Sequence, residues 1–338
     1  MRIVDSHFHW WPRSVFTEMQ KRTTFPKAES NGKGGYKVFV AEGVNRTGAW
    51  DEWFDLDGLM AHENKQGYEV DVVCSTGPIS SIFSECEPRV GLGLAQIWND
   101  EMAAAQRKHA GHLWASGVVS LADPKLAIDE LERCMKMGLI GVNIPGSIGV
   151  KGRIDAPELE AFYDRVEQLG AVLFMHPTDA AFEDICDGYD GALYASLGRV
   201  IDVSVSSYRL VLSGIMERHP SLKVFVSHTG GALPYQAGRM DKNSKAAKLP
   251  KPPSEYLKRF YTDTVNPHAL GVKLAVEFYG VDHVMWGDDY PCWNPEGAHR
   301  VFRECGLNEA DTEKIMNSNA RRILNLKEPV KQKEPIAA

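Results

Sequence analysis

Short apolar runs alternate with amphipathic segments along most of the chain. Between the runs, apolar residues recur every three or four positions, which is the spacing of one face of a helix. The runs themselves are apolar on both faces, as in strands of a parallel sheet that helices cover on both sides. We expect strands at residues 1–4, 70–74, 113–119, 140–144, 171–175, 223–227, 260–264 and 283–286, and helices at 50–66, 98–109, 124–137, 157–169, 211–218 and 267–279.

Eight strands that alternate with helices most simply close into a (β/α)8 barrel, the TIM barrel of the α/β class. The length of 338 residues suits one such barrel, and we expect a single domain at residues 1–326. Residues from about 12 to 49 are rich in glycine turn signals, which predicts an inserted loop or hairpin after the first strand. Residues 327–338 read as a polar C-terminal tail.

Composition indicates a globular protein with a mildly acidic surface, since 43% of residues are hydrophobic, 25% are charged and the net charge is -7. Basic blocks interleaved with aromatic residues are absent, which argues against nucleic acid as a partner. We see neither a leader-like segment nor an apolar run long enough for a membrane span, and expect a cytoplasmic protein. The six cysteines lack CxxC spacing, so we expect reduced thiols.

Two histidines separated by one residue, His7 and His9, follow the first apolar run. Side chains alternate between the two faces of a strand, so both imidazoles point the same way while Phe8 points the opposite way. One rigid element therefore fixes two metal ligands. Taken alone, such a pair is more often ordinary polar sequence at a strand end.

Further polar residues follow other expected strands, and together they favour a metal site over ordinary polar sequence. His176 follows the fifth expected strand, His228 follows the sixth, and Asp288 and Asp289 follow the eighth. In a (β/α)8 barrel the carboxyl ends of all strands meet at one face, where catalytic groups are found. Imidazoles and a carboxylate suit a divalent ion such as Zn²⁺ and leave a position for water or substrate.

The chain resembles the amidohydrolase superfamily, and within it the branch typified by 2-amino-3-carboxymuconate 6-semialdehyde decarboxylase, to which γ-resorcylate and 5-carboxyvanillate decarboxylases are related. The resemblance covers nearly the whole chain. It is carried by Asp5-Ser6-His7-Phe8-His9-Trp10-Trp11-Pro12, Trp98-Asn99-Asp100, residues 130–134, Phe174-Met175-His176-Pro177, Ser227-His228-Thr229-Gly230-Gly231-Ala232-Leu233-Pro234 and residues 286–291.

The resemblance implies one divalent metal, Zn²⁺ first and Mn²⁺ as the alternative, on His7, His9, His176 and Asp289. Asp288 occupies a position that is usually Ser or Thr, so the choice between the two aspartates stays open, with Asp289 preferred. His228 and Asp289 are implied in catalysis, His228 beside the metal-bound water or the substrate.

The resemblance also bears on the substrate and on assembly. It implies that Arg46, four residues before Trp50-Asp51, binds a substrate carboxylate, and that the chain forms a homodimer. From the residues alone, Trp10, Trp11 and Trp293 are candidates for the wall of an aromatic pocket, with simple packing an equal alternative. Thr178 replaces the usual tryptophan after the His-Pro pair, which leaves the identity of the small carboxylate substrate open.

Three functions remain to be separated. The first is a metal-dependent, non-oxidative decarboxylase of an aromatic or unsaturated carboxylic acid. The second is a metal-dependent hydrolase of a lactone, an amide or a C–C ring-cleavage product, in which metal-activated water is the nucleophile. The third, a metal-binding scaffold without catalysis, is disfavoured by the complete ligand set.

Overall fold

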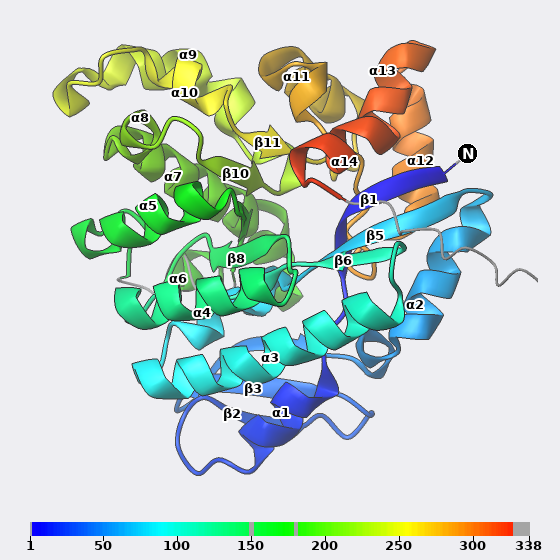
Figure 1. Ribbon diagram of the computed structural model, residues 1–338, viewed down its shortest axis with the longest axis vertical. Helices are drawn as coiled ribbons and strands as arrows, with labels where there is room; N and C mark the ends of the chain where they lie inside the picture. Colours follow the sequence, from blue (N-terminus) through cyan, green and yellow to red (C-terminus); the bar gives the residue numbers. More distant parts are fainter. Residues whose placement is uncertain (1, 149–151, 179–181, 327–338) are drawn as a thin grey trace, which may run out of the picture.

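The computed structural model describes residues 2–148, 152–178 and 182–326, and parallel strands surrounded by helices form its centre (Figure 1). The strands pair in the orders β1-β5-β6 and β7-β8-β9-β10-β11. All of these pairs are parallel. The strands are β1 (Arg2–His9), β5 (Glu69–Ser75), β6 (Leu113–Ala115), β7 (Gly117–Val118), β8 (Gly141–Pro145), β9 (Val172–His176), β10 (Lys223–Val226) and β11 (Tyr261–Thr262).

The expected eighth strand, at 283–286, is reduced to isolated contacts with its neighbours on both sides. Val284 forms a parallel bridge with Thr262 of the neighbouring strand β11, and Tyr290 forms one with Phe8 of β1. The backbone N–H of Ser6 also donates to the carbonyl of Trp286 at 2.9 Å. The segment from Val284 to Tyr290 therefore contacts both β11 and β1, and so connects the last strand in the chain to the first.

Helices follow most strands, in the alternation that the sequence predicts. Asp123 caps the helix at 124–136 by accepting hydrogen bonds from the backbone of Lys125 and Leu126, and Gly170 ends the helix at 160–169 with a φ of 63°. None of the helices within the described residues is both long and apolar enough to cross a membrane. The longer helices are α3 (Pro88–Lys108), α4 (Pro124–Lys136), α5 (Glu160–Leu169), α7 (Arg199–Leu212), α9 (Leu233–Asn243), α11 (Ala269–Tyr279) and α12 (Pro295–Glu304).

Shorter helices complete the fold. They are α1 (Arg13–Gln20), α2 (Leu56–Glu63), α6 (Glu183–Cys186), α8 (Ile215–Arg218), α10 (Pro253–Leu257), α13 (Glu309–Glu313) and α14 (Asn319–Ile323). The helix expected at 98–109 begins ten residues earlier, because Glu87 caps α3 and Pro88 occupies its first turn. The polar tail expected at 327–338 lies outside the described residues.

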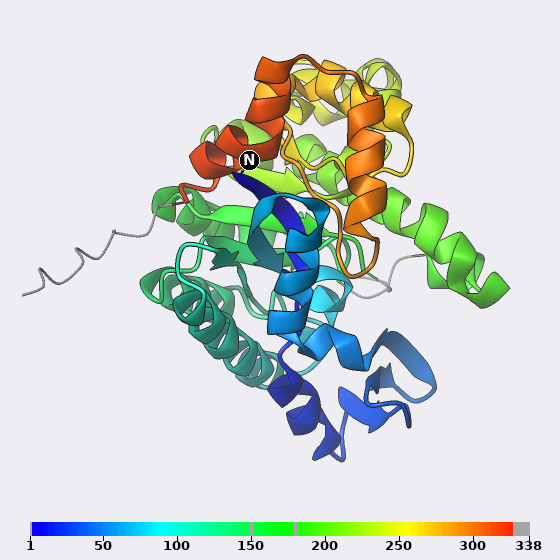
Figure 2. The same ribbon diagram turned by 90° about the vertical axis from the view of Figure 1, so that its right-hand side faces the viewer.

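The insert after the first strand is more ordered than a loop or hairpin. It contains α1 and a three-stranded antiparallel sheet of β2 (Lys27–Ser30), β3 (Tyr36–Ala41) and β4 (Val44–Ala49), which lies at one end of the molecule (Figure 2). Phe16 of α1 packs on Tyr36 and Phe54, with ring centroids 5.4 Å away in both pairs. These aromatic contacts attach the insert to the segment that leads back into the parallel sheet.

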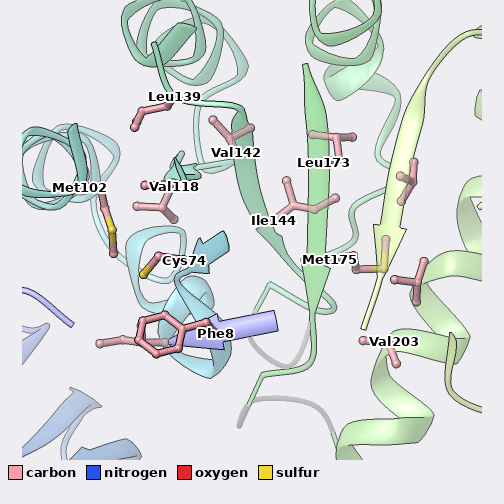
Figure 3. Packing of buried hydrophobic residues seen from close by; sticks show 14 of the residues in the cluster. Phe8, Cys74, Met102, Val118, Leu139, Val142, Ile144, Leu173, Met175 and Val203 are labelled. Atoms are coloured by element: carbon pink, nitrogen blue, oxygen red, sulfur yellow. The ribbon is translucent and has the colours of Figure 1, made fainter. Parts of the chain in front are cut away.

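Apolar side chains fill the space between the parallel strands and the helices (Figure 3). Phe8, Cys74, Val142, Ile144 and Leu173 are fully buried there. Burial of such side chains is the main source of folding free energy. The strand ends, and the side chains that follow them, are thereby held in fixed positions.

A buried polar network joins α3, β7 and α4. The Asn99 amide donates to the Val118 carbonyl at 2.9 Å and to Glu130 at 2.6 Å, and its oxygen accepts from the Val118 N–H at 2.7 Å. Arg133 donates two further hydrogen bonds to Glu130, at 2.8 and 2.9 Å. Two of the family-like segments, at 98–100 and 130–134, thus meet in a buried contact between α3 and α4.

We expect Asn99→Leu to lower the free energy of unfolding by about 3 kcal/mol or more, because Val118 and Glu130 lose buried partners while the side-chain volume stays similar. Urea titration followed by circular dichroism measures this loss. Gln168→Leu, at an exposed position, should change stability by less than about 0.5 kcal/mol. An Asn99→Leu protein as stable as the Gln168→Leu protein would contradict the role of the network.

Candidate metal centre

Three histidines and one aspartate from distant parts of the chain converge at the carboxyl ends of the strands. His7 and His9 end β1, His176 ends β9, and Asp289 lies in the segment that bridges to β1. One ligand atom of each residue lies within 4.8 Å of every other, and all four residues are buried. The Nε2 atoms of His7 and His9 are 3.1 Å apart, and the Oδ1 atom of Asp289 lies 3.0 Å from Nε2 of His9.

The Nδ1 atoms of the three imidazoles all face hydrogen-bond acceptors. Nδ1 of His7 donates to Asp263 at 2.7 Å, Nδ1 of His9 to the carbonyl of Ser75 at 3.1 Å, and Nδ1 of His176 to the carbonyl of Pro177 at 2.8 Å. In a neutral imidazole the other nitrogen then carries a lone pair. The three Nε2 atoms therefore face the centre of the cluster, and Nε2 of His176 has no hydrogen-bond partner among the described residues. This donor set fits a divalent cation, whose histidine ligands are oriented by such outer contacts.

The electrostatics of the cluster favour a positive charge at the same point. Burial alone would lower the pKa of His7, yet the carboxylates of Asp289 and Asp263 raise it to about 9. Burial would raise the pKa of Asp289, but the facing imidazoles of His7 and His9 hold it below its usual value. Asp289 is therefore ionised, and its buried charge calls for a cationic partner.

Asp289, rather than Asp288, joins the histidines. Asp289 has a φ of 63°, a left-handed conformation that is uncommon outside glycine. Asp288 instead lies in a second buried cluster with Asp5 and Glu63. Burial and the neighbouring Glu63 raise the pKa of Asp288. The geometry thus supports the aspartate that the sequence analysis prefers as ligand.

Asp263 is a functional residue that the sequence analysis missed. It follows β11 directly, and its Oδ2 accepts from Nδ1 of His7 and, at 2.9 Å, from the backbone N–H of His228. Its Oδ1 accepts from the backbone N–H groups of Thr229 and Val265, at 2.9 and 3.0 Å. The position of a carboxylate at the end of the seventh expected strand was the available signal.

His228 lies beside the cluster, as expected from its place after β10. Its ring centroid is 5.2 Å from those of His7 and His176, and within the part of the chain that the structure describes its Nε2 has no hydrogen-bond partner. Burial lowers its pKa to about 4, so its imidazole is neutral at pH 7. Gly230 allows the turn that follows, because a Cβ there would lie 2.0 Å from the Tyr279 hydroxyl.

A cavity of about 410 Å³ is lined in part by Trp53, a neighbour of His9 in the cluster. The ring of Trp53, one of its walls, is parallel to that of His9, at a centroid distance of 6.4 Å. The residues that line the cavity are Trp11, Gly48, Trp50, Glu52, Trp53, Pro78, Arg199, Pro291 and Cys292. Of its three tryptophans, Trp11 is one that the sequence predicts for an aromatic pocket, whereas Trp50 and Trp53 were not predicted.

Trp10 and Trp293, the other two tryptophans predicted for the pocket, are placed differently. Trp10 is buried and its indole N–H donates to the carbonyl of Phe54 at 3.2 Å, while Trp293 is half-buried and its backbone N–H donates to the carbonyl of Asp289 at 3.0 Å. Neither belongs to the lining of the 410 Å³ cavity. Their contact with substrate stays a prediction.

Arg46 lies in β4 and forms a buried ion pair. Its Nε donates to both carboxylate oxygens of Glu85, at 2.9 and 3.2 Å, and its terminal nitrogen lies 2.8 Å from the same group. Both side chains are less than a tenth exposed, so the charge of Arg46 is balanced within the protein. Its proposed contact with a substrate carboxylate stays a prediction.

Comparisons with known proteins agree with this geometry. A model of the amidohydrolase family matches residues 4–326. γ-Resorcylate decarboxylase from Rhizobium sp. (strain MTP-10005) is 29% identical over 256 residues, which cover 70% of this chain and 78% of the relative. 2-Amino-3-carboxymuconate-6-semialdehyde decarboxylase from Dictyostelium discoideum is 27% identical over 245 residues, which cover 70% and 67%.

A solved structure extends the likeness to the fold. Dihydroxybenzoic acid decarboxylase from Polaromonas sp. JS666, which contains manganese and the inhibitor 2-nitroresorcinol, superposes with a TM-score of 0.76 at 21% identity. The match covers 96% of this chain and 97% of that chain. At this level of identity the match concerns the fold alone.

We expect His176→Ala to remove the bound metal, because the centre loses one of its four candidate ligands. Elemental analysis of the purified variant should find less than about a tenth of one equivalent. A matched control is His299→Gln, which alters a buried histidine stacked on Tyr68 and Trp286 at 4.6 and 4.4 Å, outside the cluster. Full metal occupancy in the His176→Ala protein would refute the ligand assignment.

Proposed function

The chain belongs to the amidohydrolase family, and from this premise we propose that it is a metal-dependent decarboxylase of a small aromatic or unsaturated carboxylic acid. One observation carries the proposal, namely the convergence of three imidazole lone pairs and an ionised carboxylate beside a tryptophan-lined cavity. The decarboxylase names of the relatives support the choice of reaction.

We also propose that the parallel strands close into a (β/α)8 barrel within one domain at residues 1–326. The bridges of Val284 with Thr262 and of Tyr290 with Phe8 support closure, because they connect the last bridged segment to strands on either side. The metal centre then lies at the carboxyl face, where active sites of such barrels are found. We propose further that the chain forms a homodimer and is located in the cytoplasm.

For the metal we propose Zn²⁺, with Mn²⁺ as the other candidate. His7, His9, His176 and Asp289 supply three nitrogen donors and one oxygen donor, a set that both ions accept. The structure from Polaromonas sp. JS666 contains manganese, which supports testing both ions. When bound, the cation would supply a positive charge that stabilises negative charge as it develops on the substrate.

The reaction breaks the bond between a ring carbon and the carboxylate. The electron pair of the broken bond stays on the ring carbon, and CO₂ leaves as a neutral molecule. The ring carbon then takes up a proton. His228 is neutral at pH 7 and has an unpartnered Nε2, so it can accept a proton from a substrate hydroxyl or water and return it to the carbon. Asp263 fixes the backbone of His228 during both transfers. The tryptophan walls offer apolar faces on which an aromatic ring can stack.

The same centre could instead direct a water molecule onto a lactone, an amide or a C–C ring-cleavage product, with His228 as the base. Turnover of 2,6-dihydroxybenzoate and 5-carboxyvanillate in D₂O and in H₂¹⁸O separates the two reactions. The decarboxylase should release one CO₂ per turnover and place one deuterium on the ring, with no ¹⁸O in the organic product. Retention of the carboxylate together with ¹⁸O in the product of a lactone or ring-cleavage substrate would establish the hydrolase instead.

We expect His228→Ala to lower kcat by on the order of 100-fold while metal content stays near that of the unaltered protein. The reason is that His228 lies outside the four ligands but next to them. The control is His268→Ala, because His268 lies outside the cluster and its side chain accepts a helix-capping hydrogen bond from the Leu270 N–H at 3.2 Å. Unchanged turnover in the His228→Ala protein would remove His228 from the mechanism.

A further inference from the structure

We propose that Asp202 is a positioning residue of the metal centre, which orients His176 and strengthens it as a ligand through one peptide group. The inference rests on the proposed metal ligands and goes beyond the proposed reaction, because it concerns how one ligand is held. It is carried by two hydrogen bonds at opposite ends of the peptide that joins Pro177 to Thr178.

The peptide between Pro177 and Thr178 lies between the imidazole of His176 and the carboxylate of Asp202. Its carbonyl oxygen accepts from Nδ1 of His176 at 2.8 Å, and its N–H donates to Oδ2 of Asp202 at 2.9 Å. Because resonance couples the two ends of a peptide group, a carboxylate at the N–H increases the partial negative charge on the carbonyl oxygen. Asp202 therefore strengthens the hydrogen bond that the imidazole donates.

The carboxylate of Asp202 is held at the ends of β8 and β9. Asp202 lies in the first turn of α7 and is 1% exposed, and the hydroxyl of Thr178 donates to the same Oδ2 at 3.4 Å. Gly146, directly after β8, comes so close that a Cβ there would lie 2.4 Å from this oxygen. The backbone N–H of Gly146 in turn donates to the carbonyl of His176 at 2.9 Å. The carboxylate and the ligand are thus fixed to the same strand ends.

A second metal ligand, His9, has the same arrangement with an uncharged group at the far end. Nδ1 of His9 donates to the carbonyl of Ser75 at 3.1 Å. The N–H of the same peptide, which belongs to Thr76, donates to Oδ1 of the buried Asn143 at 3.2 Å. The recurrence favours a positioning role over a chance contact. The two arrangements differ in charge, because Asn143 is neutral whereas Asp202 is an acid.

A stronger hydrogen bond at Nδ1 has two consequences for a histidine ligand. It fixes the orientation and tautomer of the ring, and it increases the electron density that Nε2 offers to a cation. His7 receives this support directly, since its Nδ1 donates to Asp263 at 2.7 Å. Contacts of this kind change metal affinity by about 10- to 100-fold. Through Asp202, His176 receives a similar support at the distance of one peptide.

The first test measures the dissociation constant of Zn²⁺ for the full chain, by competition with a chelator. Asp202→Asn keeps the side-chain volume and an oxygen that can accept from Thr178, but removes the charge. It should weaken Zn²⁺ binding by about tenfold. Asp202→Ala also removes the acceptor and should weaken binding further, toward about 100-fold.

The matched control is Asp155→Asn, which removes a carboxylate that contacts the same helix outside the metal centre. Asp155 accepts two hydrogen bonds from Arg209 of α7, at 2.7 and 2.9 Å. The control should keep the Zn²⁺ affinity of the unaltered protein, and unfolding midpoints are measured for all variants. An equal loss of affinity in the Asp155→Asn protein would assign the effect to the packing of α7 and overturn the inference.

The second test observes the Nδ1–H protons by NMR in Zn²⁺-loaded protein with ¹⁵N-labelled histidine, because a stronger hydrogen bond moves its proton downfield. In the unaltered protein the His176 proton should lie downfield of the His9 proton. In Asp202→Asn the His176 proton should move upfield, while that of His7, which donates directly to Asp263, should stay. Histidine-to-alanine variants identify each resonance by its absence.

Three results would overturn the inference. They are the reverse order of the His176 and His9 protons in the unaltered protein, an unmoved His176 proton in Asp202→Asn, and unchanged Zn²⁺ affinity in that variant. The first needs no variant, so it decides the matter even where a substitution prevents folding. Absence of CO₂ release together with the expected affinities and shifts would refute the proposed reaction and leave the role of Asp202 intact.

Discussion

The hydrogen bonds to Asp263 are the interaction on which the rest of the site depends. One carboxylate fixes the tautomer of His7 through Nδ1 and holds the backbone of His228 and Thr229, both of which have positive φ angles. Conformations of this kind cost free energy and persist only when surrounding contacts determine them. Because the same group orients a candidate metal ligand and the candidate proton carrier, the relative positions of the two do not depend on side-chain packing alone.

Much of the site could be predicted because one rule of parallel sheets covers it. Strand carboxyl ends share an edge, so His7, His9, His176 and His228 could be placed together from their position after apolar runs alone. The rule fails where backbone geometry departs from a strand. The expected strand at 283–286 is reduced to the bridge of Val284 with Thr262, and Gly287 after it lies so close to β1 that a Cβ would be 2.8 Å from Cβ of His7.

Features that depend on pairing between distant residues could not be predicted. The ion pair of Arg46 with Glu85 joins residues 39 positions apart, and no feature of either sequence segment indicates which residue is its partner. The same is true of Trp53, which becomes a cavity wall because it lies against His9. The third strand of the insert was missed for a related reason, because glycine turn signals mark chain reversals without fixing how many strands pair between them.

The two adjacent aspartates show how the fold distributes charge around the centre. Asp289 faces imidazoles and its pKa is lowered, whereas Asp288 faces Glu63 and its pKa is raised by burial and by that carboxyl group. The pKa of Glu63 is itself raised by burial and by the charge of Asp5. Opposite shifts in neighbouring residues concentrate negative charge on the histidine side, which is the side where a cation can balance it. The position that usually holds Ser or Thr therefore accommodates an acid without adding a second full charge next to the metal ligands.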